Sequence, residues 1–486
     1  MPRIAVSGPS RLVADAAAQI SSAGGSVVDA AIVAGLTAMC TEPGVCGPGG
    51  GGFITVDLPG HDPVVIDGYM AYPGLGFEGE PRTRQVTMEY GGGVTTLVGA
   101  GSVAVPGAFA AMEKASEMFG VAPWRELMEA VASTVERGFP LSPSCRLYLT
   151  DSGPAIFSDD PAVRQIFYDG DRLRDSGETV VFPGLSETLR WIGEEGAGVF
   201  YRGDLGRQIV ADLAGRGGCV TMEDLASYRA IPREPLSVEL AGWNIEINPP
   251  PAVGGVTMAL ALADIAAAGE NTPRVWAEAL VDAFRVRTED LDPDNLEGSA
   301  HRVLTRRGLL SPSTVTVAAA DDEDGAVAAT FSAGYGSGVI PAGTGMMMNN
   351  SLGELELVEG VTPRPGERML SNMAPSVARR GTDVVAVGSP GADRITSALV
   401  VTLACLVAGE GPEAAIDHPR VHPEFGEEGV RIAAEPGLDL EALPYPIRWF
   451  DGLHMYFGGT NGAGLLEGEL HARADPRRHG VARILG

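Results

Sequence analysis

The stretch that organises the chain reads Ser313-Thr314-Val315-Thr316-Val317-Ala318-Ala319-Ala320-Asp321. Hydroxyl and aliphatic side chains alternate at its start, and a period of two residues predicts a β-strand. This strand would begin at a hydroxyl residue and end in an acidic turn. An ordinary half-buried strand shows the same alternation. The stretch by itself therefore predicts a strand and leaves open whether Thr314 has a chemical role.

The residues that follow predict the partner of this strand. Asp324-Gly325 is a turn signal, and the apolar run 326–332 has the length of a strand. A loop rich in glycine, 335–339, comes next. We therefore expect a β-hairpin that carries Thr314 at the start of one strand and Ser332 at the end of the other.

A helical pattern covers residues 11–40, and Gly24-Gly25-Ser26 divides it into two helices. The glycine run 49–52 follows and leads directly into the apolar segment 53–56. A phosphate-binding loop would instead follow a strand and open a helix, and no Gly-Lys-Ser/Thr motif is present. We therefore interpret the run as a turn where backbones pack closely, and we do not favour a nucleotide-binding protein. Two further amphipathic helices are expected at 183–194 and 205–214.

The composition is that of a folded protein with a large core. The chain has 486 residues and a hydrophobic content of 45%, which suits two or three domains or one large layered unit. Its 63 acidic and 35 basic residues give a formal charge of −28, which repels nucleic acid and acidic membranes. The long apolar run 398–408 is too short to cross a bilayer. No export signal is visible, so we expect a cytoplasmic protein without nucleic-acid or membrane partners.

The five cysteines are an odd number and are spread along the chain. They have no Cys-x-x-Cys spacing and form no Cys/His cluster in the sequence. This pattern argues against a disulfide framework and against a structural zinc site. We expect that the protein needs neither a metal nor a cofactor.

Short motifs occur in a fixed order along the chain. The earlier ones lie at 23–31, 42–43, 49–53, 105–107, 138–140, 200–203, 223–228 and 249–255. The most specific ones lie at 344–354, 368–376 and 388–395, and 419–422 and 474–480 follow them. Together they resemble the γ-glutamyltranspeptidase family of the N-terminal-nucleophile hydrolases, which are made as one chain and cut themselves in two.

The resemblance implies an α+β fold, a four-layer αββα sandwich of the N-terminal-nucleophile hydrolase type with helices outside two facing sheets. It also implies that this single fold is built from two segments. Residues 1–313 would be the large-subunit segment and residues 314–486 the small-subunit segment, and the two would stay associated after the cut. Residues 288–313 are charged and turn-rich, as expected of an exposed segment before a cleavage point.

Thr314 is the nucleophile that the resemblance implies. Family members have a threonine followed by a strand and an Asp-x-Asp-Gly turn, and Thr314 stands seven residues before Asp321. A threonine at a new N-terminus carries its own general base, the α-amino group. A register anchored on Gly325 without a gap would instead place Val315 there, and valine has no hydroxyl. Ser313 and Thr316 are the remaining alternatives.

The resemblance also implies supporting groups for this nucleophile. The backbone amides of Gly391 and Ala392 would form the oxyanion hole, where the family has two glycines. Alanine can serve if its conformation does not require a positive φ. Ser332 stands in the place of a family threonine that hydrogen-bonds the nucleophile, and a solvent-facing strand serine is the alternative. His422 lies beside an arginine, and we expect it to be structural.

The substrate-binding positions depart from the family pattern. The family arginine that binds the γ-glutamyl α-carboxylate is replaced by Tyr69, and a phenol cannot replace a bidentate guanidinium. A pair of serines has become Ser371-Asn372, and an acidic pair has become Gly353-Glu354. We therefore expect a small amino-acid-like substrate at Tyr69, Glu354, Ser371 and Asn372 that is not glutathione.

Two alternatives to this hydrolase or acyltransferase remain open. The first is a member of a divergent bacterial branch in specialised metabolism that cleaves a carbon–carbon bond, which the altered pocket motivates. The second is a non-catalytic homologue that binds a small molecule and is never cut. Tyr69 and Ala392 favour the second alternative.

Overall fold

The computed structural model describes residues 2–89, 93–289, 292, 295–296, 299, 314–358, 361–426 and 429–486. Most of the segment 288–313, including Ser313, lies outside these residues. The expected exposure of that segment therefore stays a prediction.

Two sheets form the centre of the molecule, and all neighbouring strands within each are antiparallel. The first sheet has the order β10-β3-β2-β14-β13-β1-β22, and the second has the order β11-β12-β15-β16-β20-β21. The first consists of β1 (Ile4–Gly8), β2 (Gly51–Asp57), β3 (Val64–Gly68), β10 (Ile231–Arg233), β13 (Val315–Asp321), β14 (Ala326–Ser332) and β22 (Val481–Leu485). The second consists of β11 (Leu236–Leu240), β12 (Trp243–Ile247), β15 (Ser376–Arg380), β16 (Asp383–Gly388), β20 (Asn461–Leu466) and β21 (Glu469–Ala474). The predicted hairpin is thus β13–β14, near the middle of the first sheet.

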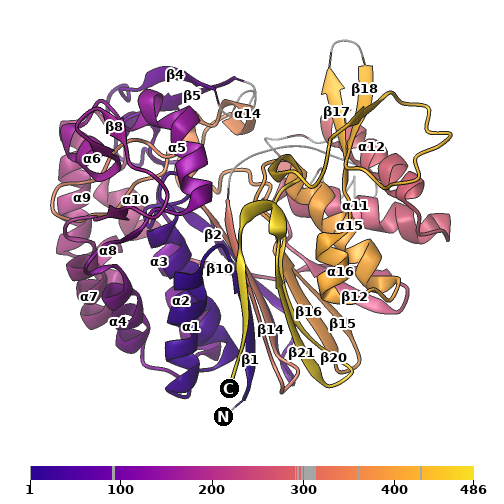
Figure 1. The fold of residues 1–486 in the computed structure, drawn as a ribbon. Helices are drawn as coiled ribbons and strands as arrows, with labels where there is room; N and C mark the ends of the chain where they lie inside the picture. Colours follow the sequence, from indigo (N-terminus) through magenta and orange to yellow (C-terminus); the bar gives the residue numbers. More distant parts are fainter. Residues whose placement is uncertain are drawn as a thin grey trace.

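Helices cover the outer face of each sheet, which gives four layers in the order α, β, β, α (Figure 1). On the side of the first sheet lie α1 (Arg11–Ser22), α2 (Val27–Thr41), α3 (Ala108–Phe119), α4 (Trp124–Val135), α5 (Pro143–Ile156), α6 (Pro161–Phe167), α7 (Leu185–Glu195), α8 (Gly198–Tyr201), α9 (Asp204–Gly215) and α10 (Met222–Ser227). On the side of the second sheet lie α11 (Val253–Ala268), α12 (Pro273–Glu289), α15 (Arg394–Val407) and α16 (Pro412–Asp417). The α+β sandwich that the resemblance implied is confirmed.

Smaller elements complete the fold. They are the pairs β4 (Arg84–Met88) with β5 (Val94–Val98), β6 (Phe139–Pro140) with β9 (Thr179–Val180) and β7 (Tyr168–Asp169) with β8 (Arg172–Leu173), the sheet β17 (Val421–Gly426), β18 (Gly429–Ala434) and β19 (Ile447–Trp449), and the short helix α14 (Leu355–Val358). In the described part of the chain, no helix is both long enough and apolar enough for a bilayer crossing.

The two faces of β13 face different cores. Val315, Val317 and Ala319 belong to the core between the first sheet and its helices. Ala318 and Ala320 belong to the core between the two sheets. Because side chains alternate along a strand, residues 314 and 316 share the inter-sheet face with these alanines. Both threonines therefore lie on the face of the first sheet that meets the second sheet.

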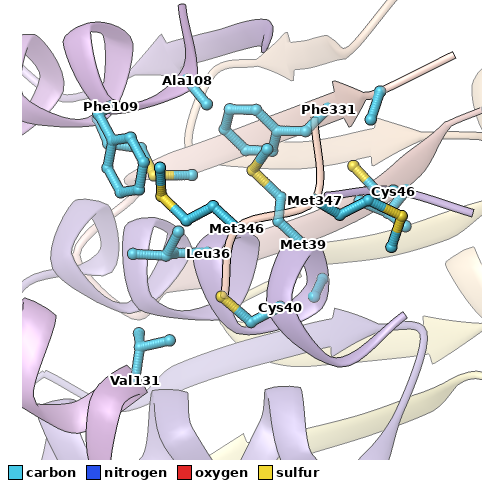
Figure 2. Close-up of a cluster of buried hydrophobic side chains, with 14 of the residues drawn as sticks. Leu36, Met39, Cys40, Cys46, Ala108, Phe109, Val131, Phe331, Met346 and Met347 are labelled. Carbon is cyan, nitrogen blue, oxygen red and sulfur yellow. The ribbon is translucent and has the colours of Figure 1, made fainter. Parts of the chain in front are cut away.

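The helix α2 packs directly against the hairpin. The predicted division of residues 11–40 is confirmed, and a capping box between Ser26 and Asp29 begins α2. Every residue of α2 is buried. Figure 2 shows Leu36, Met39 and Cys40 of α2 in one apolar cluster with Phe331 of β14 and with Met346 and Met347, which follow later in the chain. A Cβ at Gly35 would lie 2.8 Å from the Phe331 ring, so the small residues of α2 allow this close approach.

The glycine run at residues 49–52 lets β2 lie close to β14. A Cβ at Gly50 would lie 2.0 Å from the carbonyl oxygen of Ser332, and one at Gly52 would lie 2.1 Å from that of Thr330. Any side chain here would collide with main-chain atoms that cannot move away. The prediction of a turn where backbones pack closely is confirmed.

Candidate active site

Several strand ends meet at one end of the sandwich. Because β13 and β14 are antiparallel, the start of β13 and the end of β14 lie at the same edge of the first sheet. In the second sheet, β16 ends at Gly388, where a Cβ would lie 2.0 Å from Oγ1 of Thr316. The end of β16 therefore lies directly against the start of β13. This contact brings the segment after Gly388 close to Thr314.

Thr314 lies at the mouth of the inter-sheet space. It directly precedes β13 and is only 1% exposed. It lines a cavity together with Pro390, Asn461, Glu42 and Arg478. The cavity thus joins the predicted nucleophile to the segment 388–395 that carries the predicted oxyanion hole.

The alternatives to Thr314 differ from it in structure. The Val315 side chain points to the opposite face of the sheet, into the helix-side core. Thr316 lies inside the strand, where its Oγ1 donates to the carbonyl oxygen of Ala329 at 3.2 Å and lies 3.1 Å from Oγ1 of Thr330. A cut before Thr316 would break the ladder between β13 and β14. Ser313 lies outside the described residues.

Ser332 is the predicted support of the nucleophile. The register pairs Val315 with Phe331, so the next pair along the two strands is Thr314 with Ser332. The side chains of such a pair lie on the same face of the sheet. The serine is buried, which excludes the solvent-facing alternative. Its Oγ accepts a hydrogen bond from the Gly334 amide at 3.0 Å. The role of Ser332 toward Thr314 stays a prediction.

The predicted oxyanion hole lies between β16 and α15. Gly391 has φ 135° and Ala392 has φ 63°. Ala392 therefore does not meet the condition that we set for an alanine at this position, and it holds the left-handed conformation at a cost of roughly 1–2 kcal/mol. Gly391 cannot be replaced easily, because its Cβ would lie 2.8 Å from Cα of Gly458. Both residues lie just before the first residue of α15, Arg394, where the helix dipole favours negative charge.

Tyr69 lies in the same row of the first sheet as Thr314. Ser332 pairs with Gly51, and the pairing of Gly52 with Gly68 places Tyr69 beside Gly51. Three strand spacings then separate Tyr69 from Thr314 across the sheet, roughly 14 Å. The Tyr69 ring is buried and stacks on Phe53, with the ring centroids 5.4 Å apart. Tyr69 does not line the cavity at Thr314.

Glu354 lies close to the loop after β14. Its side chain is fully buried. A Cβ at Gly334 would lie 2.9 Å from Oε1 of Glu354 and 2.4 Å from Oδ1 of Asn350. Gly334 has φ 62°, and its amide binds Ser332. Glu354 therefore lies next to Gly334, which in turn binds Ser332, the predicted support of the nucleophile.

Ser371 and Asn372 are buried in the loop before β15. The Oγ of Ser371 accepts from the Met373 amide at 3.2 Å. Oδ1 of Asn372 accepts from Nη2 of Arg287 at 2.8 Å. Neither Ser371 nor Asn372 lines the cavity at Thr314.

Arg287 is a buried residue that no sequence motif indicates. This residue of α12 is only 1% exposed, although arginine is seldom fully buried. A signal was present in the sequence, because Leu280, Ala283, Phe284 and residue 287 have the spacing of one helix face. An arginine on an apolar stripe indicates a buried cation.

Glu42 is a cavity residue that the sequence motifs did not predict. Burial raises its pKa to about 7, although hydrogen bonds from Ser142 at 2.6 Å and from Sγ of Cys145 at 3.1 Å act in the opposite direction. A carboxyl group that titrates near neutral pH therefore lies in the wall of the Thr314 cavity.

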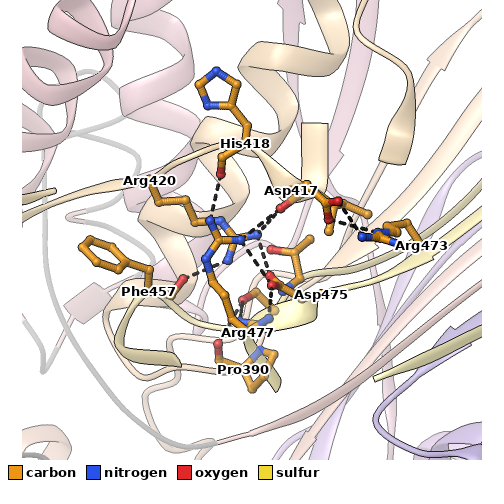
Figure 3. A network of polar contacts seen from close by, with 12 residues as sticks. Pro390, Asp417, His418, Arg420, Phe457, Arg473, Asp475 and Arg477 are labelled. Atoms are coloured by element: carbon orange, nitrogen blue, oxygen red, sulfur yellow. Dashed lines mark hydrogen bonds and ion pairs between the residues drawn. The ribbon is translucent and has the colours of Figure 1, made fainter. Parts of the chain in front are cut away.

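A buried charge network supports the wall of this cavity at Asp475 (Figure 3). Arg420 Nη2 lies 2.7 Å from Asp475 Oδ2, and Arg477 Nη1 lies 3.2 Å from Oδ1. Arg477 also pairs with the buried Glu435. Burial alone would raise the pKa of Asp475, but the two guanidinium groups hold it below the usual value. The network fixes Asp475 in its ionised form.

His422 contacts Asp393, the residue after Ala392. Its Nδ1 lies 2.8 Å from Oγ of Ser397, and its Nε2 lies 3.5 Å from Oδ2 of Asp393. Burial alone would raise the pKa of Asp393, but Arg394, His422 and Arg287 lower it. The buried histidine thus contacts the chain where it enters α15, and its structural role stays a prediction.

The fold brings together a group that the sequence does not suggest. In the described part of the chain, ligand atoms of Cys405, Glu410 and His418 lie within 4.8 Å of one another. Burial raises the pKa of the Cys405 thiol, which disfavours the thiolate that metals bind. Cys405 lies eleven residues along α15 from Arg394, about 16 Å from the oxyanion end. This group is therefore separate from the candidate site.

The chain is similar to known proteins in its sequence and in its fold. The family model for gamma-glutamyltranspeptidase matches residues 13–307 and 287–485. The glutathione hydrolase proenzyme of Pseudomonas aeruginosa is 28% identical over 99% of this chain and 94% of that protein. The acylase ACY 1 proenzyme of Pseudomonas sp. (strain V22) is 30% identical over 85% of this chain and 81% of that protein. A cephalosporin acylase from Bacillus halodurans has the same fold, with a TM-score of 0.81 at 23% identity over 99% of this chain and 96% of that chain.

Proposed function

Because this chain belongs to the γ-glutamyltranspeptidase family, we propose that it cuts itself before Thr314 and then uses Thr314 to cleave an amide or acyl compound. The relatives named above are a glutathione hydrolase proenzyme and an acylase proenzyme, and their names support this class of reaction. The observation that carries the proposal is the position of Thr314. It is buried at the start of β13, on the inter-sheet face, in one cavity with Pro390.

In the self-cleavage that we propose, the hydroxyl oxygen of Thr314 attacks the carbonyl carbon of Ser313. The carbon–nitrogen bond breaks, an ester forms, and the former amide nitrogen becomes the α-amino group of Thr314. Water then hydrolyses the ester and leaves a carboxylate on residue 313. The product is a pair of chains, 1–313 and 314–486.

The sheet order supports continued association of the two chains. In the first sheet, β13 lies between β1 and β14, and β14 lies between β13 and β2. The small-segment hairpin β13–β14 therefore lies between two strands of the proposed large segment, β1 and β2. In the second sheet, β12 of the large segment pairs with β15 of the small one. Separating the chains would expose both cores, so a cut before Thr314 would leave the sandwich intact.

The catalytic cycle would use the same oxygen. The α-amino group takes the proton of the Thr314 hydroxyl, whose oxygen attacks the substrate carbonyl. The backbone amides of Gly391 and Ala392, at the N-terminal end of α15, would stabilise the oxyanion. The ammonium group then passes its proton to the leaving amine, and an ester to Thr314 forms. Water or an acceptor amine releases the acyl group and restores the hydroxyl.

We further propose that glutathione is not the substrate. The family position of a carboxylate-binding arginine holds Tyr69, whose buried ring stacks on Phe53. A phenol in an apolar stack supplies no positive charge for the α-carboxylate of a γ-glutamyl group. The carboxylate-binding contact of a glutathione hydrolase would therefore be missing at this position.

A denaturing gel followed by N-terminal sequencing tests the proposal. We expect two bands for the wild-type chain, with Thr314 as the first residue of the smaller one. Thr314→Ala should give one band, and Thr314→Ser should give two bands more slowly because it keeps a hydroxyl nucleophile. One band for folded wild-type protein, or a new end elsewhere, would overturn the proposal. Release of p-nitroaniline from γ-glutamyl-p-nitroanilide at a rate typical of a glutathione hydrolase would overturn the substrate part alone.

A further inference from the structure

Arg287 is a buried cation with unused hydrogen-bond donors. Its Nη2 donates to Oδ1 of Asn372 at 2.8 Å. Its Nε and Nη1 are buried, and neither has a hydrogen-bond partner among the described residues. Burial lowers the pKa of this guanidinium group, but an arginine side chain stays protonated in proteins, so the positive charge persists. Leaving the donors of such a charge unpaired in a buried position costs free energy, so these two atoms call for an acceptor.

Asn372 adds a further donor to the same place. Because Arg287 can only donate, it must face the Oδ1 atom of the Asn372 amide. The amide nitrogen of Asn372 is then directed elsewhere, and it is also buried without a partner among the described residues. The two side chains together present three nitrogen donors that lack acceptors. An ionised carboxylate has two oxygens that only accept, so it matches this set.

The charged groups around Arg287 do not fully neutralise its positive charge. Among the described residues, Asp393 is the carboxylate whose charge acts on Arg287. Asp393 already binds Arg394 through Oδ1 at 2.7 Å and faces Nε2 of His422 through Oδ2 at 3.5 Å. Two guanidinium groups therefore share one carboxylate. The ring of Phe284, with its centroid 5.2 Å from Arg287 Cζ, covers the guanidinium without supplying an acceptor.

Arg287 and Asn372 lie close to the candidate site. Asp393 directly follows Gly391 and Ala392, the predicted oxyanion residues. The main chain of Asn372 packs on Gly254 in the first turn of α11, where a Cβ would lie 2.0 Å from its carbonyl oxygen. The first turns of α11 and α15 thus meet beside Arg287, since Oγ1 of Thr396 donates to the carbonyl oxygen of Gly254 at 3.4 Å.

We propose that Arg287 and Asn372 form a buried subsite that binds a carboxylate of the substrate. The identification of the ligand as substrate rests on the proposed function, whereas the anion site itself rests on the unused donors. The cation comes from α12 of the second helix layer, whereas the Tyr69 position lies at the end of β3 in the first sheet. A carboxylate held here would enter the site from the side of α12 and would select acids over neutral compounds of the same length.

Thermal shift assays with small carboxylates test the subsite directly. The probes are acetate, glutarate and L-glutamate, each compared with its amide (acetamide, glutaramide or L-glutamine) at equal ionic strength. We expect at least one carboxylate, and no amide, to raise the melting temperature of the wild-type protein. Arg287→Gln should abolish this shift, and Arg287→Lys should restore part of it. Arg285→Gln is the matched control, because Arg285 lies on the same helix and is exposed to solvent. It should respond as the wild type does.

A kinetic comparison ties the subsite to the reaction. Glutaryl- and pentanoyl-p-nitroanilide have acyl chains of equal length and differ in the terminal carboxylate. Arg287→Gln should lower kcat/KM for the glutaryl compound by about 10²-fold, mainly through KM, and should leave the pentanoyl compound within about threefold. Equal losses on both compounds, or no carboxylate-dependent thermal shift in the wild type, would overturn the subsite. The proposed function fails separately, through a single band on the gel, and this outcome leaves the carboxylate shift measurable.

Discussion

Oγ1 of Thr316 lies 3.1 Å from Oγ1 of Thr330, directly across the pair of strands that begins at Thr314. This buried contact fixes the register of β13 against β14 at a position two residues after Thr314, before which the proposed cut lies. It thereby holds Ser332 opposite Thr314. The two threonines on this face of β13 thus have different tasks in our proposal, because Thr316 holds the register and Thr314 is the proposed nucleophile.

Thr316→Val should separate these two tasks. The substitution removes a hydroxyl that bonds both Ala329 and Thr330, so we expect the free energy of unfolding to fall by about 1–2 kcal/mol. Self-cleavage should continue, because Thr316 is not the proposed nucleophile. Urea denaturation and a denaturing gel measure the two effects. A Thr316→Val chain that stays in one piece while Thr314→Ala is cut would move the nucleophile to residue 316.

Ala392→Gly should stabilise the protein. Ala392 has φ 63°, which glycine adopts without strain, so we expect a gain of about 1 kcal/mol in the free energy of unfolding. The proposed oxyanion amide is retained, and the rate of cleavage should change by less than about twofold. Ala241→Gly is the matched control, because Ala241 also has a positive φ, 52°, in the exposed turn between β11 and β12. A loss of stability in Ala392→Gly would contradict the assigned conformation.

Asp475→Asn should destabilise the protein strongly. Removing this carboxylate leaves Arg420 and Arg477 buried with less negative charge, and we expect a loss of about 3 kcal/mol. Asp417→Asn is the control, because its ion pair with Arg473 is partly exposed and should contribute about 1 kcal/mol or less. If the two substitutions lower the free energy of unfolding equally in urea denaturation, the Asp475 network stabilises the protein no more than a surface ion pair does.

The depressed pKa of Asp475 also predicts an acid limit. A group whose pKa is lowered by folding stabilises the folded state at pH values above its unfolded pKa, 3.8. The stabilisation is lost as the pH falls below that value toward the folded pKa. The stability difference between wild type and Asp475→Asn should therefore be constant from pH 5 to 7 and should shrink below pH 4. A difference that grows with acid would reverse this sign.

Glu42 should produce the opposite pH dependence. Its pKa rises from 4.5 to about 7 on folding, so the folded state binds more protons than the unfolded state between these values. Stability should fall as the pH rises from 4.5 to 7, by about 3 kcal/mol in total. Glu42→Gln mimics the protonated form and should remove this slope. The comparison of denaturation midpoints at pH 5 and pH 8 measures it, and an unchanged slope in the variant would show that another group causes it.

Local patterns predicted the elements that carry the site. The alternation in 313–321 and the turn at 324–325 predicted the hairpin, and the division at 24–26 predicted α1 and α2. Such patterns depend on neighbours within a few residues, because strand and helix periods are local properties. The layer order came from the resemblance, since periodicity does not say which sheet faces which.

The site itself was predicted less completely. The motifs located Thr314 and the turn at Gly391, but they gave Ala392 no backbone conformation. That conformation depends on the turn from β16 into α15 and on the close approach of Gly458 to Gly391. At Tyr69 the sequence showed that the carboxylate-binding arginine of the family is absent. No motif marked Arg287, which lies far from both Tyr69 and Asn372 in the sequence.

The sequence by itself determined the β13–β14 hairpin, the helices α1 and α2 and the threonine at the start of β13, because these follow from spacing along the chain. Only the tertiary structure decided that Thr314 faces the second sheet, that Ser332 lies opposite it and that Arg287 meets Asn372. These relations depend on strand register and on the packing of α12 and α15 against the second sheet. A sequence records which donors and acceptors a chain has, whereas burial decides which of them are left without a partner.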